Sequence, residues 1–80
     1  MSVLLIGCWD GDTLTVEQSH TINDGDQEAI DALLAEVEFD WWACEYLVDR
    51  HSEAIQMAYD DQIAPGEHLV DNVEGYEPTP

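Results

Sequence analysis

The sequence predicts a single α+β domain, in which an N-terminal β-hairpin, with or without a third antiparallel strand, packs against two or three α-helices. Three observations predict this fold. A continuous apolar run at 2–9 and an alternating run at 13–17 flank an Asp-Gly pair. Apolar residues recur at helical spacing over the middle of the chain, and a Pro-Gly pair follows them. The 80 residues suit one domain, which we expect at 1–76, with a frayed tail at 77–80.

The hairpin is predicted from the Asp-Gly pair at 10–11, which separates the continuous apolar run 2–9 from the alternating run 13–17. Glycine adopts the positive φ of a type I′ turn without steric cost, so this pair between two strand-like runs is a good hairpin signal. Alternation along a strand then places Leu14 and Val16 toward the core and the residues beside them toward water.

The first helix is expected at about 26–37, because Ile30 and Leu33 belong to an apolar series with helical spacing. Asp24 followed three residues later by Gln27 has the form of a capping box, in which side chains bond the free amides of the first turn. The preceding residues are expected to form a loop.

A second helical stretch is expected at about 40–61, beginning at Asp40. Its apolar stripe consists of Trp42, Ala43, Tyr46, Leu47, Ala54, Met57 and Ala58. Polar residues at 50–52 interrupt the stripe, which leaves open whether the stretch is one helix or two. The Pro-Gly pair at 65–66 ends it, and residues 68–73 are the candidate for a third strand beside the hairpin.

Two adjacent tryptophans, Trp41 and Trp42, lie near the start of this stretch. Neighbouring residues on a helix point about 100° apart, so both rings cannot face the centre of one core. We expect Trp42, which fits the stripe with Tyr46, in the core. Trp41 is expected to be half exposed, either as an anchor for a partner or as a cover for the core edge.

Charge is the most unusual property of the chain. Nineteen carboxylates stand against one basic residue, Arg50, which gives a formal net charge of −18. A small domain seldom needs a net charge beyond roughly 8 for solubility, and self-repulsion opposes compactness. Because 45% of the residues are hydrophobic, the chain is expected to fold in spite of its charge.

The spacing of the acidic residues suggests two surface patches. On the predicted second helix, Glu45, Asp49 and Glu53 are spaced by four residues, and Asp60 follows seven residues later, so they form a row along one face. Like charges at this spacing destabilise a helix, and ordinary surface helices alternate the sign. The second patch lies at the start of the first helix and consists of Asp24, Asp26, Glu28 and Asp31.

A rigid row of carboxylates can take the place of the phosphates of a nucleic acid in a groove lined with lysine and arginine. In size, charge and lack of basic residues, the whole chain resembles the small acidic DNA-mimic inhibitors of phages and mobile elements, of the anti-CRISPR and anti-restriction type. The resemblance involves no residue motif. It implies a viral inhibitor, not an enzyme, that occupies the basic channel of a nucleic-acid-binding partner such as a CRISPR surveillance complex or a restriction enzyme.

The alternative is a salt-adapted, halophilic acidic protein-interaction module without mimicry, since acidic surfaces with scarce lysine are typical of proteins adapted to molar salt. A calcium site is not expected, because the Asp-rich segments starting at Asp10 and Asp24 lack the ligand positions of an EF-hand loop. No cofactor, direct nucleic-acid contact or small-molecule substrate is expected either.

The remaining chemistry-bearing residues show no recognisable pattern. The three histidines have no metal-ligand spacing, and Ser19 has no recognisable base partner in the sequence. Cys8 and Cys44 are expected to be thiols rather than a disulfide, in line with a cytoplasmic protein, in the host cell if a phage encodes it. The apolar stretch 3–6 lacks a basic flank and is too short for a signal peptide, and no apolar run is long enough to span a membrane.

Overall fold

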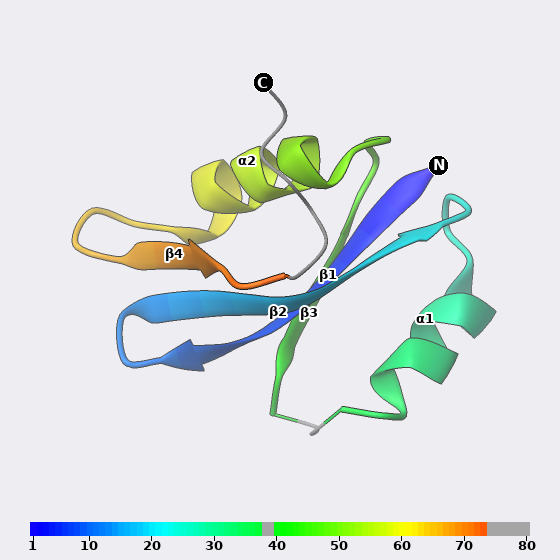
Figure 1. Ribbon diagram of the computed structural model, residues 1–80, viewed down its shortest axis with the longest axis horizontal. Helices are drawn as coiled ribbons and strands as arrows, with labels where there is room; N and C mark the ends of the chain where they lie inside the picture. The colour runs from blue at the N-terminus through cyan, green and yellow to red at the C-terminus, as the bar shows by residue number, and fades with distance from the viewer. Residues whose placement is uncertain (38–39, 74–80) are drawn as a thin grey trace.

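The computed structural model describes residues 1–37 and 40–73, so the predicted tail lies outside the described residues. The α+β class and the N-terminal hairpin packed against helices are confirmed (Figure 1). The elements in chain order are β1 (Ser2–Asp10), β2 (Thr13–Ile22), α1 (Gln27–Leu34), β3 (Trp42–Tyr46), α2 (His51–Gln62) and β4 (His68–Asp71).

The strands form one four-stranded mixed sheet with the order β3-β1-β2-β4. β1 is antiparallel to both β2 and β3. The expected third strand at 68–73 exists as β4, but it pairs with β2 in parallel, so an all-antiparallel sheet is wrong. The reason is α2, which returns the chain to the hairpin end of the sheet before β4 begins, so that β4 runs in the same direction as β2 (Figure 1).

The hairpin turn differs in type from the prediction. Asp10 pairs with Thr13, so Gly11 and Asp12 are the central residues of the turn. Gly11 has a φ of 64°, and no non-glycine residue among those described has a positive φ. A positive φ at the first central residue alone is typical of a type II′ turn, whereas type I′ needs it at both.

A β-bulge in β2 determines which face each half of this strand covers. Ile6 pairs with Gln18 and Gly7 pairs with Val16, so the register shifts at this point. Val16 therefore packs in the core on one face, whereas Ile22, also at an even position, packs in the core on the other.

The sheet has a core on each face, and one helix covers each core (Figure 1). The core under α2 contains Val3, Leu5, Val16, Tyr46, Ala54 and Ala58. The core on the α1 face contains Leu4, Ile6 and Ile22, against which side chains of α1 pack. Burial on both faces explains why β1 is a continuous apolar run, while Leu14 and Val16 are fully buried as predicted.

The prediction of a helix beginning at Asp40 is wrong, because residues 42–46 form the edge strand β3 and only 51–62 are helical. The apolar residues of the segment 42–46 fit both the helical period of 3.6 residues and the strand period of two residues. As a strand, it directs Trp42, Cys44 and Tyr46 to the core under α2 and Ala43 to the opposite core. The pairing of β3 with the otherwise unpaired edge of β1 decides between the two periods, which is a tertiary effect.

The two tryptophans are both half-buried and lie against opposite cores, Trp42 under α2 and Trp41 on the α1 face. Neither tryptophan is fully buried: each covers the edge of one core, so the expected difference between a core Trp42 and a half-exposed Trp41 is not found. The first helix is shorter than predicted, and its cap is Asp26, whose carboxylate accepts a hydrogen bond from the Ala29 amide at 3.2 Å. The expected capping box of Asp24 and Gln27 is not the cap.

Candidate functional site: the acidic end of the sheet

The topology gathers carboxylates at one end of the sheet. β1 begins where β2 and β3 end, as the pairs Ser2–Ile22 and Val3–Tyr46 show, and both helices begin just beyond that end. Acidic residues are favoured at helix N-termini by the helix dipole, and loops before helices favour aspartate as a cap. We call this region the acidic end and define it by Asp24, Asp26, Glu28, Glu45, Asp49 and Glu53.

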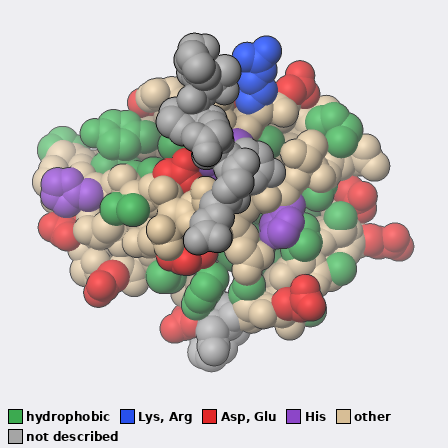
Figure 2. Space-filling model, in the orientation of Figure 1, with side chains coloured by type: hydrophobic (Ala, Val, Ile, Leu, Met, Phe, Trp, Pro, Cys, Tyr) green, Lys and Arg blue, Asp and Glu red, His purple; other side chains and the backbone are tan. Residues whose placement is uncertain are grey.

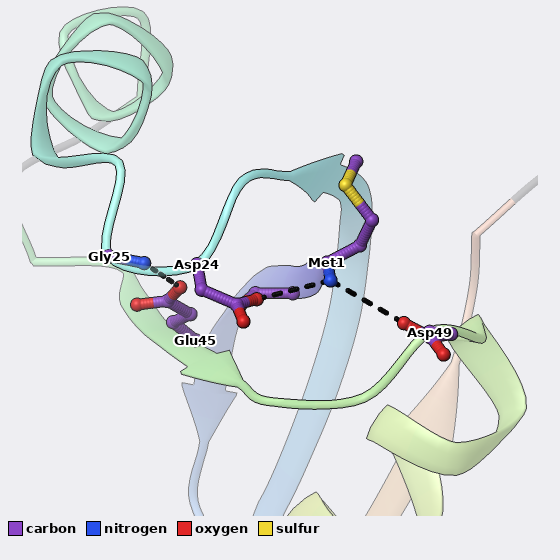
Figure 3. A network of polar contacts seen from close by, with 6 residues as sticks. Met1, Asp24, Gly25, Glu45 and Asp49 are labelled. Atoms are coloured by element: carbon purple, nitrogen blue, oxygen red, sulfur yellow. Dashed lines mark hydrogen bonds and ion pairs between the residues drawn. The ribbon is translucent and has the colours of Figure 1, made fainter.

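Three segments meet at the centre of the acidic end (Figure 3). The N-terminal ammonium of Met1 lies 3.3 Å from Asp24 Oδ1, in the loop before α1, and 3.5 Å from Asp49 Oδ1, in the loop before α2. Glu45, on β3, accepts a hydrogen bond from the Gly25 amide through Oε2 at 2.9 Å. Asp24 is thereby held on one surface with Glu45 and Asp49, which are more than 20 positions away in the chain.

The protonation of Asp24 is coupled to this network. The Ser2 hydroxyl donates to Asp24 Oδ1 at 2.7 Å, and this hydrogen bond together with the N-terminal ammonium lowers the pKa of the carboxyl. The same contact with Asp24 raises the pKa of the ammonium. Asp24 therefore keeps its negative charge to a lower pH than an ordinary aspartate does.

Four of the six residues of the acidic end are exposed, whereas Asp26 and Glu45 are half-buried. The side chains of Asp24 and Asp49 are 62% and 80% exposed, and Glu28 and Glu53, in the first turns of their helices, are exposed as well. The region contains six carboxylates and two cationic groups, the ammonium and Arg50 at the start of α2, so it keeps an excess of four negative charges. It can therefore attract a cationic group of another molecule.

The predicted row of four carboxylates on one helix face does not exist, because Glu45 is on β3 and Asp49 is in a loop. Glu53 and Asp60 are both on α2, but Asp60 lies in its last turn, away from the acidic end. Of the second predicted patch, Asp31 lies a turn further along α1. The structure nevertheless joins most of the two predicted patches into one region, by topology rather than by helical periodicity.

Trp41 is not part of the acidic end. It precedes the first residue of β3, whereas the acidic end lies where that strand ends, and its ring packs against the core on the α1 face. A role in binding a partner is therefore not supported for this side chain.

The sequence patterns did not predict a second polar cluster, which consists of Ser19, His51 and Asp71. The ring of His51 lies between Ser19 Oγ, 2.8 Å from Nδ1, and Asp71 Oδ2, 2.7 Å from Nε2, and its side chain is only 8% exposed. These residues come from β2, α2 and β4 and are 32 and 20 positions apart, so no local pattern relates them. The same three residue types form the Ser-His-Asp triad of hydrolases, but there the serine bonds Nε2 and the aspartate bonds Nδ1.

The remaining candidate ligands are dispersed. Cys8 and Cys44 are free cysteines, as expected. Among residues 1–37 and 40–73, no three side chains of the His, Cys, Asp or Glu type are arranged to hold a metal ion. The helices in the same part of the chain are too short or too polar to cross a membrane.

Comparison of the chain with protein-family models, with curated proteins and with solved structures gave no match. Function is therefore inferred from the geometry and charge of the acidic end.

Proposed function

We propose that the chain is an inhibitor that mimics a nucleic acid and inserts its acidic end into the basic channel of a DNA- or RNA-binding protein. The observation that carries the proposal is the convergence of Asp24, from the loop before α1, with Glu45 and Asp49, from the end of β3 and the loop after it, around the N-terminus. Carboxylates held by a sheet and two helix starts form a preorganised anionic surface, and arginine and lysine bind such groups as they bind phosphates.

The overall charge supports the same function. A net charge of −18 on 80 residues would accelerate the approach to a cationic channel, and the attraction would decline with ionic strength. A CRISPR surveillance complex and a restriction enzyme are two partners with channels of this kind. The protein would act by occupying the channel, without a chemical step.

The test is capture of partner proteins by the immobilised full chain from a cell lysate, followed by elution with duplex DNA or with RNA. We expect nucleic-acid-binding proteins to be retained and then released by the polynucleotide competitor. The first variant combines Glu28→Gln, Asp49→Asn and Glu53→Gln, three exposed carboxylates of the acidic end. We expect it to lose affinity for the captured partner by roughly tenfold or more.

The matched control combines Asp10→Asn, Asp12→Asn and Glu36→Gln, three exposed carboxylates outside the acidic end. Both triple variants change the net charge from −18 to −15, so only the position of the change differs. Equal loss of affinity in the two variants would show that the acidic end has no special role and would refute its assignment as the binding surface.

A second function is favoured by the carboxylates outside the acidic end, which are distributed over the turns, both helices and β4. Figure 2 shows acidic side chains at several separate places on one face. This distribution supports a salt-adapted acidic interaction module. Thermal unfolding as a function of salt separates the two functions: a mimic is folded at low salt, whereas a salt-adapted domain unfolds below about molar salt.

A further inference from the structure

A hollow of about 450 Å³ lies between α2 and the outer strand β3. Its lining combines apolar and acidic groups: Tyr46 on β3, and Met57, Asp60 and Asp61 on α2. The hollow is shallow and open to solvent, so a side chain of another protein can lie in it. It is separate from the acidic end as defined above, because it shares none of those six carboxylates.

The apolar part of the hollow is partly open to solvent. Met57 is 44% exposed although it is a large hydrophobic side chain, whereas Tyr46 is 6% exposed and forms part of the core under α2. A flexible thioether beside an aromatic ring is a surface on which an aliphatic chain packs well.

The acidic part of the hollow has a fixed orientation at Asp61. The Tyr46 hydroxyl donates to Asp61 Oδ2 at 3.4 Å, and the Gln62 amide donates to the same oxygen at 2.8 Å. Burial raises the pKa of Tyr46, so its hydroxyl remains a donor. Because both bonds end on Oδ2, the second carboxylate oxygen keeps its capacity to accept from a ligand.

We propose that this hollow binds an arginine side chain of a partner protein. The aliphatic part of the arginine packs on Met57 and Tyr46, and the guanidinium lies against the carboxylates of Asp60 and Asp61. The inference relies on the proposed function only in taking the partner to be a basic protein.

The chemistry of the lining distinguishes arginine from other occupants. Guanidinium is planar, weakly hydrated, able to stack on an aromatic ring and equipped with five donors, whereas the ammonium of lysine is a compact, strongly hydrated charge. An anion would be repelled by the carboxylates. A metal ion is not favoured, because Asp60 and Asp61 are the only two carboxylates that line the hollow, and no three His, Cys, Asp or Glu side chains among the described residues are arranged to hold one.

The test uses the full chain, labelled for NMR, and two probes of equal charge: acetyl-Gly-Arg-Gly-amide and acetyl-Gly-Lys-Gly-amide. We expect the arginine peptide to shift the Met57 methyl signal and the amide signals of Asp60 and Asp61 more strongly than the lysine peptide. The double variant Asp60→Asn, Asp61→Asn should reduce the affinity for the arginine peptide by roughly three- to tenfold.

The matched control is Asp10→Asn with Glu36→Gln, which removes the same charge at exposed positions away from the hollow and should change the affinity by less than about twofold. Met57→Ala keeps every carboxylate and should weaken arginine binding while leaving lysine binding unchanged. Equal shifts with both peptides, or equal effects of the two double variants, would overturn the inference.

The inference and the proposed function can fail separately. Peptide binding is measured without any partner protein, so a positive result in the hollow stands even if polynucleotides release nothing from the immobilised chain. Conversely, a lysate partner released by DNA but sensitive only to the acidic-end variant would support the mimic and exclude the hollow from its contact surface.

Discussion

His51 Nε2 on α2 and Asp71 Oδ2 on β4 lie 2.7 Å apart, so one contact connects the second helix to the edge strand that follows it. On the other side of the ring, Nδ1 contacts Ser19 of β2. β4 has only four residues and pairs along one edge with β2. A side chain that joins it to two other elements is therefore an important part of how this short strand is held.

The first prediction concerns this anchor. His51→Ala should destabilise the fold by about 1–3 kcal/mol, because it removes a nearly buried ring together with its contacts to Ser19 and Asp71. Equilibrium denaturation measures the change. The matched control is His68→Ala at an exposed position of β4, which should cost less than about 0.5 kcal/mol. A similar cost at both positions would contradict the anchoring role.

Gly7 on β1 faces the backbone of β2 so closely that no side chain fits. A Cβ added there would lie 2.2 Å from the Thr15 carbonyl oxygen, which is backbone and cannot move aside alone. Gly7→Ala should therefore cost about 1–3 kcal/mol or more through displacement of the strands. Ala32→Gly on the exposed face of α1 is the comparison, with an expected cost of about 1 kcal/mol. Chemical denaturation of both variants measures the difference, and a tolerated Gly7→Ala would contradict the strand spacing seen here.

The stability of the acidic end should depend on pH through two groups, Asp24 and the Met1 ammonium, whose contributions are lost in opposite directions of pH. The pKa of Asp24 is lowered by its hydrogen bond with Ser2 and by the ammonium, so its contribution is present above its unfolded pKa and is lost as the pH falls through the folded pKa. The pKa of the Met1 ammonium is raised above 8.0 by Asp24, so its contribution is present below that value and is lost as the pH rises through the folded pKa.

Titration of the Asp24 carboxyl carbon by NMR measures the first effect. Ser2→Ala should raise the pKa of Asp24 toward its ordinary value, because it removes the largest cause of the shift. Thr13→Ala, which removes a hydroxyl near Asp12 instead, should leave the pKa of Asp24 unchanged. If the pKa of Asp24 stays the same in Ser2→Ala, the hydrogen bond is not its cause.

Asp26 and Glu28 are both acidic residues at the start of α1, but only Asp26 caps the helix. Asp26→Ala should cost about 1 kcal/mol, since the Ala29 amide loses its acceptor, whereas Asp26→Asn keeps an acceptor and should cost less. Glu28→Ala, on the same turn and with no cap bond, is the control. Thermal unfolding at matched salt separates the three, and equal melting temperatures for Asp26→Ala and the control would remove the capping role.

Local sequence patterns were sufficient to predict the elements that are formed by residues close together in the chain. The Asp-Gly pair between a continuous apolar run and an alternating run predicted the hairpin, and helical periodicity predicted α1 and most of α2, because the residues that form these elements are neighbours in the chain. The run 2–9 also carried the information that β1 is buried on both faces, although the sequence did not show which elements cover it.

The patterns failed where two periods fit the same residues or where the contacts are distant in the chain. Residues 42–46 suit a helix as well as a strand, and only the open edge of β1 decides for β3. The Ser19–His51–Asp71 cluster exists because three elements converge, which no spacing in the sequence reveals.

For the candidate site, composition determined that the surface is strongly anionic, since 19 carboxylates cannot be buried or paired with one arginine. Which of them lie together was decided by the fold. The antiparallel pairing of β1 with both β2 and β3 places two strand ends and two helix starts at the same end of the sheet. This arrangement brings Asp24, Glu45 and Asp49 to one surface, whereas the predicted row along one helix does not exist.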